Sequence, residues 1–208
     1  MHTTTINDLM QMESRSRANL INSLSGYKSP MLLGSGHDQS ENLALFSNIF
    51  HIGSHPPLIG LFFRPDEGKQ TLKNILKYLQ FSLNFINQDQ IKSAHQTSAR
   101  YPENISEFEK TDFTSIYYKD SSAPFISESP LSLGLSFKEK LDVESNKTSI
   151  VIAQIDFIKS HDTLLENEDF HLEKHSDVAV KGLDTYYFTQ KLYQLSYAKP
   201  DSFPKEIS

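Results

Sequence analysis

Two polar residues interrupt an apolar stretch within the segment Asn42–Pro57. Ser47 and Asn48 follow Leu43–Phe46 and precede Ile49–Ile52, and both flanks have the composition of a β-strand. A polar side chain that is buried in a strand costs free energy unless something hydrogen-bonds it. Either the polar side of this strand faces water, or Ser47 and Asn48 bind a ligand. These residues alone leave both interpretations open.

The glycines Gly34 and Gly36 suggest a phosphate-binding loop, but the rest of that pattern is missing. A dinucleotide-binding fingerprint needs a third glycine where this sequence has Gln39, and an amphipathic helix should follow. Neither requirement is met, so we interpret the glycines as a turn between two strands.

Two pairs of histidines have the spacing that can bind zinc when both members lie on a helix. His51 and His55 lie in a strand-like segment, where residues four apart are separated by about 13 Å, too far for one ion. His171 and His175 could share a helical turn, but they lack the glutamate spacing of a zinc protease and have no evident third ligand. We therefore predict no metal site.

The sequence contains no cysteine. This excludes disulfides, thiolate metal sites, iron–sulfur clusters and cysteine nucleophiles. There is no Gly-x-Ser-x-Gly motif either, so nothing indicates a hydrolase. Any redox chemistry must be carried by an organic cofactor.

The length of 208 residues suits one domain, and the formal charge of −6 argues against nucleic acid as the main partner. A local cluster of donors could still hold a small phosphate ligand. No apolar run approaches the roughly 18–20 residues that cross a bilayer, and the N-terminus has no apolar signal core. We expect no membrane segment and a cytoplasmic location.

Alternating or β-branched apolar residues predict strands, at 31–33, 43–52, 58–63, 81–85, 131–137 and 150–158. The first two should form a hairpin, with Ile49–Ile52 continuing the second strand until Pro56 and Pro57 end it. The segment 58–63 is apolar throughout, which is typical of a strand buried on both faces. A hairpin loop at Asn146 and Lys147 should join the last two strands.

Helices are predicted at 14–24, at 91–100, and after Ser106, which has the spacing of a capping box with Glu109. The clearest helix carries an apolar stripe from Leu72 to Leu79, with Thr71 at its N-cap. The aromatic segment 186–197 has no clear type. Six to eight strands with a few short helices favour an antiparallel barrel over a βαβ sheet.

The motifs, taken in order, resemble the flavin reductase-like (flavoredoxin-like) family of FMN-binding split-barrel proteins. The segment Asn42–Pro57 is similar to the family core, which runs from an Asn-x-Ala-x-Phe-Ser motif to Pro-Pro-Leu. Thr71-Leu72-Lys73-Asn74-Ile75 resembles the start of the family helix. Segments 94–99, 128–130 and 182–187 also match in order and spacing. The resemblance covers residues 18–200, with an N-terminal extension at 1–17 and a C-terminal tail at 201–208.

This resemblance implies a mainly β fold, a six-stranded antiparallel Greek-key split barrel with a few short helices. It also implies a homodimer that binds FMN near the subunit interface. The residues implied to contact FMN are Asn42, Leu45, Phe46, Ser47, Asn48, Ile49, Phe50, Arg64, Thr71, Asn74, His95, Gln96, Thr97, Ser98 and Tyr186.

Each group of these residues suits one part of FMN. Ser47, Asn48 and Arg64, with Thr71 and Asn74 near a helix start, could bind the phosphate. The apolar residues among positions 45–50 could line the ring, and the polar cluster 95–98 could reach the ribityl or phosphate end. Simpler roles remain open. Thr71 could do no more than cap its helix, and Arg64 could form ion pairs with the acidic residues at 66–67.

The implied function is an NAD(P)H-dependent oxidoreductase of the flavin reductase or flavoredoxin type. Hydride or electrons would pass from a reduced nicotinamide or a partner protein through FMN to an acceptor. No catalytic residue is required of the protein, because the flavin ring itself carries the hydride. Two alternatives are a flavin-binding or storage module without turnover, and a split barrel for ligands of the pyridoxal phosphate type.

Overall fold

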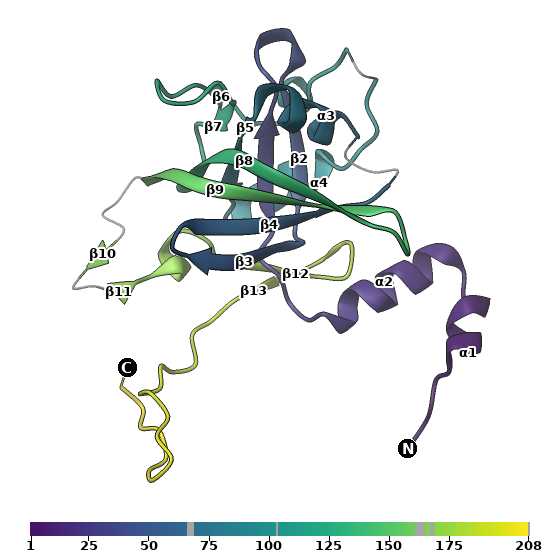
Figure 1. The fold of residues 1–208 in the computed structure, drawn as a ribbon, viewed down its shortest axis with the longest axis vertical. Helices are drawn as coiled ribbons and strands as arrows, with labels where there is room; N and C mark the ends of the chain where they lie inside the picture. Colours follow the sequence, from purple (N-terminus) through teal and green to yellow (C-terminus); the bar gives the residue numbers. More distant parts are fainter. Residues whose placement is uncertain (66–68, 103, 161–164, 167–168, 208) are drawn as a thin grey trace.

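The chain folds around one antiparallel sheet of seven strands (Figure 1). The computed structural model describes residues 1–65, 69–102, 104–160, 165–166 and 169–207. Across the sheet the order is β2-β1-β5-β8-β9-β4-β3. These strands are β1 (Met31–Ser35), β2 (Asn42–Phe46), β3 (Ile49–Ser54), β4 (Pro57–Phe63), β5 (Gln80–Phe85), β8 (Leu131–Val143) and β9 (Thr148–Ser160).

Helices and three short two-stranded ribbons surround this sheet. The helices are α1 (Ile6–Gln11), α2 (Ser14–Leu24), α3 (Lys69–Tyr78) and α4 (Ile91–Gln96). The ribbons pair β6 (Ser115–Ile116) with β7 (Phe125–Ile126), β10 (Leu165–Glu166) with β11 (Asp169–Phe170), and β12 (Val178–Lys181) with β13 (Thr185–Phe188). Within the described residues, no helix is long and apolar enough to cross a membrane.

The two edge strands of the sheet, β2 and β3, are consecutive in the chain. We expected one strand over 43–52, and this is wrong, because the chain leaves β2 at Phe46 and enters β3 at Ile49 on the opposite edge. Three residues span at most about 11 Å, so the two edges must approach each other and the sheet must curl into an open barrel. Dividing this segment gives seven strands where six were expected.

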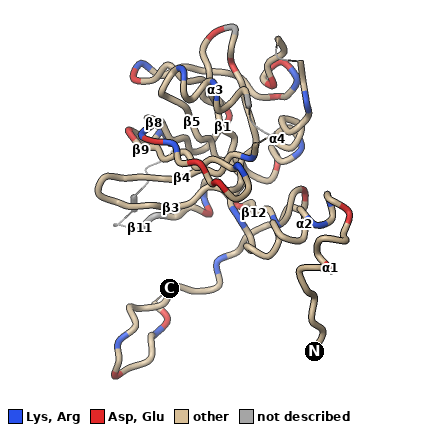
Figure 2. Tube along the Cα trace, turned by 45° about the vertical axis from the view of Figure 1, so that its right-hand side comes forward, with Lys and Arg blue, Asp and Glu red and all other residues tan. Residues whose placement is uncertain are grey.

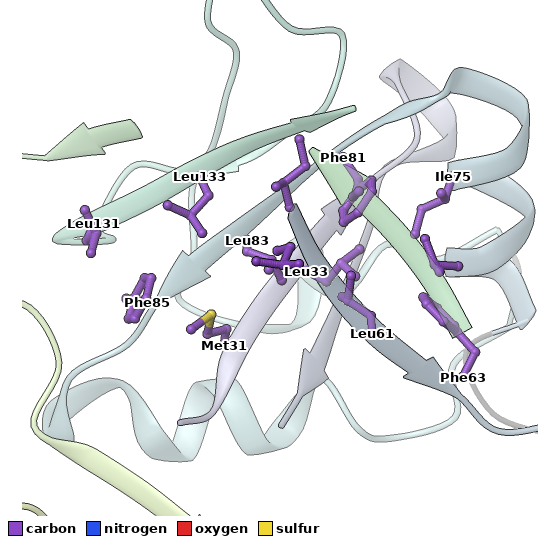
Figure 3. Close-up of a cluster of buried hydrophobic side chains, with 14 residues drawn as sticks. Met31, Leu33, Leu61, Phe63, Ile75, Phe81, Leu83, Phe85, Leu131 and Leu133 are labelled. Carbon is purple, nitrogen blue, oxygen red and sulfur yellow. The ribbon is translucent and has the colours of Figure 1, made fainter. Parts of the chain in front are cut away.

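The interior of the barrel is filled by side chains from five strands and α3 (Figure 3). Phe63, Phe81, Leu61 and Leu135 are almost completely buried there. The expectation that 58–63 is buried on both faces is wrong in part, because Phe62 is 41% exposed. Alternate residues of β4 point into the barrel, and Phe62 lies on its outer face.

The outer face of β5 is polar and yet buried. Ser82 and Asn84 alternate with the core residues of β5, as the period-two pattern predicted. Asn84 Nδ2 donates to the carbonyl of Leu32 (3.0 Å), and Asn84 Oδ1 accepts from Ile126 N (3.2 Å) and Ser132 Oγ (2.9 Å). These hydrogen bonds fasten the segment before β8 to the sheet.

The predicted helix at 14–24 is confirmed as α2, and the hairpin of β1 with β2 is also confirmed. The N-cap role of Thr71 is wrong, because α3 begins at Lys69 and Thr71 faces inward from its first turn. The helix expected at 91–100 ends at Gln96. The short helix after Ser106 and the turn between His171 and His175 are both 3₁₀ helices.

The aromatic segment 186–197 divides at Phe188. Its first residues belong to β13, whereas the residues after Thr189 leave the barrel as an extended arm (Figure 1). The hairpin loop at Asn146 and Lys147 is confirmed, and it joins two strands that run well beyond the predicted limits.

Candidate functional site

Ser47 and Asn48 form the corner that connects the two edges of the barrel. The carbonyl of Asn48 accepts a hydrogen bond from Phe62 N at 3.1 Å, which fixes the corner against β4. Both side chains are half-buried, and neither makes a side-chain hydrogen bond with any residue that the structure describes. Polar groups at the open seam of a barrel are therefore available to a ligand.

Two cations lie beside this corner. Arg64 follows the end of β4, two residues beyond the Phe62 amide that binds Asn48. Burial, together with the nearby charge of Arg64, lowers the pKa of Lys28 from its ordinary value. Lys28 Nζ also donates to the carbonyl (3.0 Å) and to Oδ1 (2.6 Å) of Asn22. Two positive charges held close together on an acidic protein favour an anionic ligand.

A backbone ladder connects these cations to the second cluster of polar residues. Lys28 forms a bridge with Val180 of β12, and Val180 is paired with Tyr186 of β13. Neighbouring strands lie about 4.8 Å apart, so the backbones of Lys28 and Tyr186 are separated by about 10 Å. The hairpin of β12 and β13 thus brings Tyr186, from late in the chain, to within about 10 Å of the backbone of Lys28.

Tyr186 binds His95 of α4. Its Oη lies 2.8 Å from His95 Nδ1, and the two rings meet edge to face at 5.7 Å. Burial, with the nearby charge of Asp184, raises the pKa of Tyr186 to about 12. The phenol therefore keeps its proton at neutral pH, and its hydrogen bond with Nδ1 fixes the orientation of the His95 ring.

The helix α4 is placed by one buried side chain. Ala94 packs with Leu43 and Leu45 of β2 in a second apolar cluster outside the barrel. This contact turns His95, Gln96 and Ser98 toward solvent, while Thr97 is buried and donates to the carbonyl of Ala94 at 2.8 Å. The polar end of α4 is thereby held beside β2.

Comparison with known proteins tests the family that the motifs suggested. Residues 24–195 match the model of the flavin reductase like domain. The chain belongs to this family. Its fold matches a protein from Shewanella frigidimarina NCIMB 400 that is assigned as a flavin reductase with a split barrel domain, with 38% identity and a TM-score of 0.89. That match covers 95% of this chain and all of the other.

Two more distant structures share the fold alone. Nitrilotriacetate monooxygenase component B from Bacillus cereus is 18% identical, with a TM-score of 0.82 over 94% of this chain and 98% of that one. Flavoredoxin of Desulfovibrio vulgaris (Miyazaki F) is also 18% identical, with a TM-score of 0.70 over 85% and 92%. The family and the mainly β split-barrel fold expected from the motifs are confirmed.

Three residues implied by the family resemblance lie away from the corner, where α3 packs against the start of β2. Asn42 Nδ2 donates to Thr71 Oγ1 at 2.9 Å, and Asn74 Nδ2 donates to the carbonyl of Ser40 at 3.0 Å. All of Asn42, Thr71 and Asn74 are buried, and their hydrogen bonds fasten α3 to the loop between β1 and β2. Their side chains are engaged within this flavin reductase-like domain.

The apolar residues expected around the flavin ring do not form one surface. Phe46 packs on Phe63 with ring centroids 4.9 Å apart, and Ile49 joins the same barrel core. Leu45 points to the other side of β2, toward α4. Phe50 lies on the outer face of β4, where its ring occupies the space above Gly60. Strand alternation causes this division.

Sequence reasoning missed Lys28, which no motif contains. Its position is set by the long-range bridge to Val180, and no local pattern predicts that contact. The histidine pairs considered for metal binding lie apart from the corner: His51 and His55 are exposed on β3 and its turn, and His175 is buried after a 3₁₀ helix. Among the described residues, no cluster of three or more potential metal ligands was found.

Proposed function

We propose that this chain is an FMN-binding oxidoreductase of the flavin reductase or flavoredoxin type. Its electron donor would be NADH, NADPH or a reduced partner protein. The observation that carries the proposal is the corner, where half-buried Ser47 and Asn48 lie beside Arg64 and Lys28. Two cations and two polar side chains at the seam of the barrel suit the phosphate dianion of FMN.

In this proposal each polar group has a distinct role. Arg64 and Lys28 hold the phosphate, and Ser47 and Asn48 add hydrogen bonds to it. The exposed imidazole of His95, oriented by Tyr186, hydrogen-bonds the ribityl chain or the ring edge, with Gln96, Thr97 and Ser98 beside it. Backbone groups at the ends of β2 and β3, from Leu45 to Phe50, contact the ring.

Asn42, Thr71 and Asn74 stay in the proposed site as residues that position it. Their hydrogen bonds fix the position of α3 against the start of β2. Because β2 is also paired with β1 along its length, we infer that the corner at the end of β2 is fixed in position as well. A corner that is rigid before binding loses less conformational entropy when a cofactor arrives.

The reaction needs little from the protein beyond binding. When bound, the flavin ring supplies the two-electron chemistry by accepting hydride from a reduced nicotinamide and passing electrons on. The residues of this chain bind and orient the cofactor, and the phenol of Tyr186 keeps its proton and orients the ring of His95. We also propose that the domain spans residues 18–200 and that the protein is a homodimer.

Spectroscopy of the purified full chain tests this function. FMN, FAD and pyridoxal phosphate are added separately, and the absorbance and fluorescence of each ligand are followed. We expect the visible bands and the fluorescence of FMN to change at saturation. Unchanged FMN spectra would contradict the proposal, and tighter binding of pyridoxal phosphate would favour the alternative split barrel.

Anaerobic stopped-flow mixing with NADH or NADPH then separates the enzyme from a storage module. Rapid bleaching of bound FMN supports the oxidoreductase. FMN that binds but is not reduced by either nicotinamide supports reduction by a partner protein or a module without turnover. A reduced electron-transfer protein distinguishes these two cases. It should bleach the bound flavin if the chain accepts electrons from a partner protein, and it should leave the flavin oxidised if the chain is a module without turnover.

A further inference from the structure

The chain beyond β13 leaves the barrel as an arm, defined here as residues 190–207. Thr189 N still donates to the carbonyl of Asp177 at 2.8 Å, and beyond this point the chain runs away from the barrel. Two views turned by 45° both show the arm standing apart from the barrel (Figures 1 and 2). The arm is thus placed to reach a surface outside its own barrel.

The arm has internal order, although its apolar side chains face water. Ser196 N donates to the carbonyl of Lys205 at 2.8 Å, and Ile207 N donates to the carbonyl of Gln194 at 2.9 Å, which closes a small loop. Leu192 is 86% exposed, Tyr197 89% and Phe203 95%. A folded segment that presents its largest apolar side chains to solvent is preorganised for a partner surface.

A second uncovered apolar surface lies on α1 and α2. Neither helix contains a buried residue. Their exposed apolar side chains are Ile6, Met10, Ile21 and Leu24. The surface is nevertheless anchored, because Asn19 Oδ1 accepts a hydrogen bond from Leu183 N at 3.0 Å in the turn of β12 and β13.

The arm and the helices are attached to the same ribbon. Tyr27, which follows α2, meets the ring of Tyr187 of β13 edge to face at 4.9 Å, and the arm begins just beyond that strand. One molecule therefore carries a projecting apolar segment and a fixed apolar surface close to a common root. This is the combination that a self-complementary contact between two identical chains requires.

We propose that the arm packs on the α1–α2 surface of a second copy of this chain, so that two copies exchange arms. In a two-fold dimer both arms contribute, each with Tyr193, Tyr197 and Phe203. Six aromatic side chains that bury about 150–250 Å² each supply on the order of 1,000 Å². With the helix surface added, this approaches the roughly 1,200–2,000 Å² of a stable interface.

Charge is also compatible with a second copy as the occupant. The arm carries three lysines, Lys191, Lys199 and Lys205, against two acidic residues, whereas the whole chain has a formal charge of −6. The arm therefore has a formal charge of +1 and the rest of the chain −7, so long-range electrostatics do not oppose the approach of the arm to a second copy. Because the arm begins beyond the strand that bears Tyr186, the exchange also brings the second copy close to the β12–β13 side of the candidate site.

Light scattering after size exclusion tests the exchange on the full chain. The wild type is expected to have twice the chain mass of 23.7 kDa. The triple variant Leu192→Asp, Tyr197→Asp, Phe203→Asp should have the mass of one chain, and its circular dichroism should be unchanged because these side chains are outside the core. The control Leu141→Asp, Ile158→Asp changes exposed residues of β8 and β9 and should remain a dimer.

A wild type of single-chain mass overturns the proposal and indicates a different occupant for the arm. A triple variant that stays dimeric overturns it as well, and so does a control that dissociates in place of the triple variant. None of these results depends on flavin, so failure here is distinct from failure of the proposed flavin binding and reduction, although a single-chain mass would also contradict the proposed homodimer.

Disulfide trapping tests the surface that receives the arm. The chain has no cysteine, so Phe203→Cys and Leu24→Cys chains of different tag length can be purified separately, mixed and oxidised. We expect a disulfide between the two kinds of chain, formed much faster than between Phe203→Cys and a Leu141→Cys control. Equal rates for the two pairs, or no disulfide, would overturn the assignment of α1 and α2.

Discussion

Ser47, Asn48, Arg64 and Lys28 are the residues on which the proposed flavin site depends. Three of them lie within one stretch of sequence, and the structure joins them through the hydrogen bond from Phe62 N to the carbonyl of Asn48. The fourth, Lys28, comes from outside that stretch and arrives through its bridge to Val180. Two of these four residues are cations, which should bind the phosphate and not the flavin ring. Removing a cation therefore separates phosphate binding from ring binding.

Replacing Arg64 with methionine should weaken FMN binding but leave riboflavin binding almost unchanged. A charge-assisted hydrogen bond to phosphate contributes about 1.5–3 kcal/mol, which is about 10- to 100-fold in affinity. Riboflavin lacks the phosphate and does not use this contact. Fluorescence titration with both flavins measures the ratio of the two affinities, which should fall by this factor. We expect Lys28→Met to lower the same ratio.

The matched control is Lys138→Met, which removes an exposed cation from β8. This variant should bind both flavins as the wild type does. If Arg64→Met weakens riboflavin and FMN equally, Arg64 does not contact the phosphate and the site has been oriented wrongly.

Tyr186 gives a prediction about pH. Its pKa is raised from 10.0 to about 12, so the folded chain keeps the phenol proton where the unfolded chain has lost it. The contribution of Tyr186 to stability is complete below the unfolded pKa and is lost as pH rises through the folded pKa. After allowance for solvent screening, we expect the free energy of unfolding to fall by about 1–2 kcal/mol between pH 10 and about 12.

Urea unfolding at several pH values compares Tyr186→Phe with the wild type. The variant should lack this part of the alkaline decrease, while Tyr193→Phe, an exposed change in the arm, should keep it. Tyr117 also has a raised pKa but is present in all three proteins, so the difference isolates Tyr186. Identical alkaline curves for all three would show that the phenol is not buried as described.

At the scale of elements, the corner depends on how the sheet is divided. Hydrophobic alternation located each strand, but it could not show that 43–52 is two strands, because β2 and β3 have similar composition and differ only in their partners. Those partners are far away in sequence. For the same reason Thr71 resembled an N-cap: the start of α3 is at Lys69, and the burial of Thr71 against Asn42 is a tertiary contact.

The elements predicted well are those with strong local signals. The α3 stripe, the alternation of β5 and the Asn146–Lys147 loop depend on residues close together in sequence. Part of the candidate site was named from the resemblance: the residues of the β2–β3 corner, Arg64, and, separately, His95 and Tyr186. Nothing local indicated that these last two side chains meet, because 91 positions separate them.

Asn84 should be the polar residue whose loss most disturbs the sheet. Asn84→Leu removes hydrogen bonds to four groups, three of them on other strands, and leaves the Ile126 amide and the Ser132 hydroxyl without this partner in the interior. We expect a loss of about 2–4 kcal/mol in the free energy of unfolding by urea. Ser132→Ala removes one of these hydrogen bonds and should cost about 1 kcal/mol. A change below about 0.5 kcal/mol in Asn84→Leu would refute this role.

At the scale of the whole molecule, the barrel is compact, and segments at both ends of the chain extend beyond it. Its N-terminal helices and its C-terminal arm project from the barrel (Figures 1 and 2). Neither set of apolar side chains is covered by the rest of the same chain. If arms are exchanged, part of the stability of the protein must come from association, which depends on concentration.

Thermal unfolding should therefore depend on protein concentration. We expect the Tm of the wild type to rise when the concentration is increased about a hundredfold, because mass action favours the associated form. The Tm of the arm variant Leu192→Asp, Tyr197→Asp, Phe203→Asp should not change over the same range. A wild-type Tm that does not depend on concentration would contradict the exchange of arms.

The central claim is that the β2–β3 corner holds the phosphate of FMN, and a crystal structure of the full chain grown with saturating FMN tests it most directly. We predict the phosphate within about 3 Å of the Arg64 guanidinium, beside Lys28, Ser47 and Asn48, with His95 near the ribityl chain or ring edge. A phosphate bound elsewhere, for example at the start of α3, or crystals that contain no flavin at saturation, would contradict the claim.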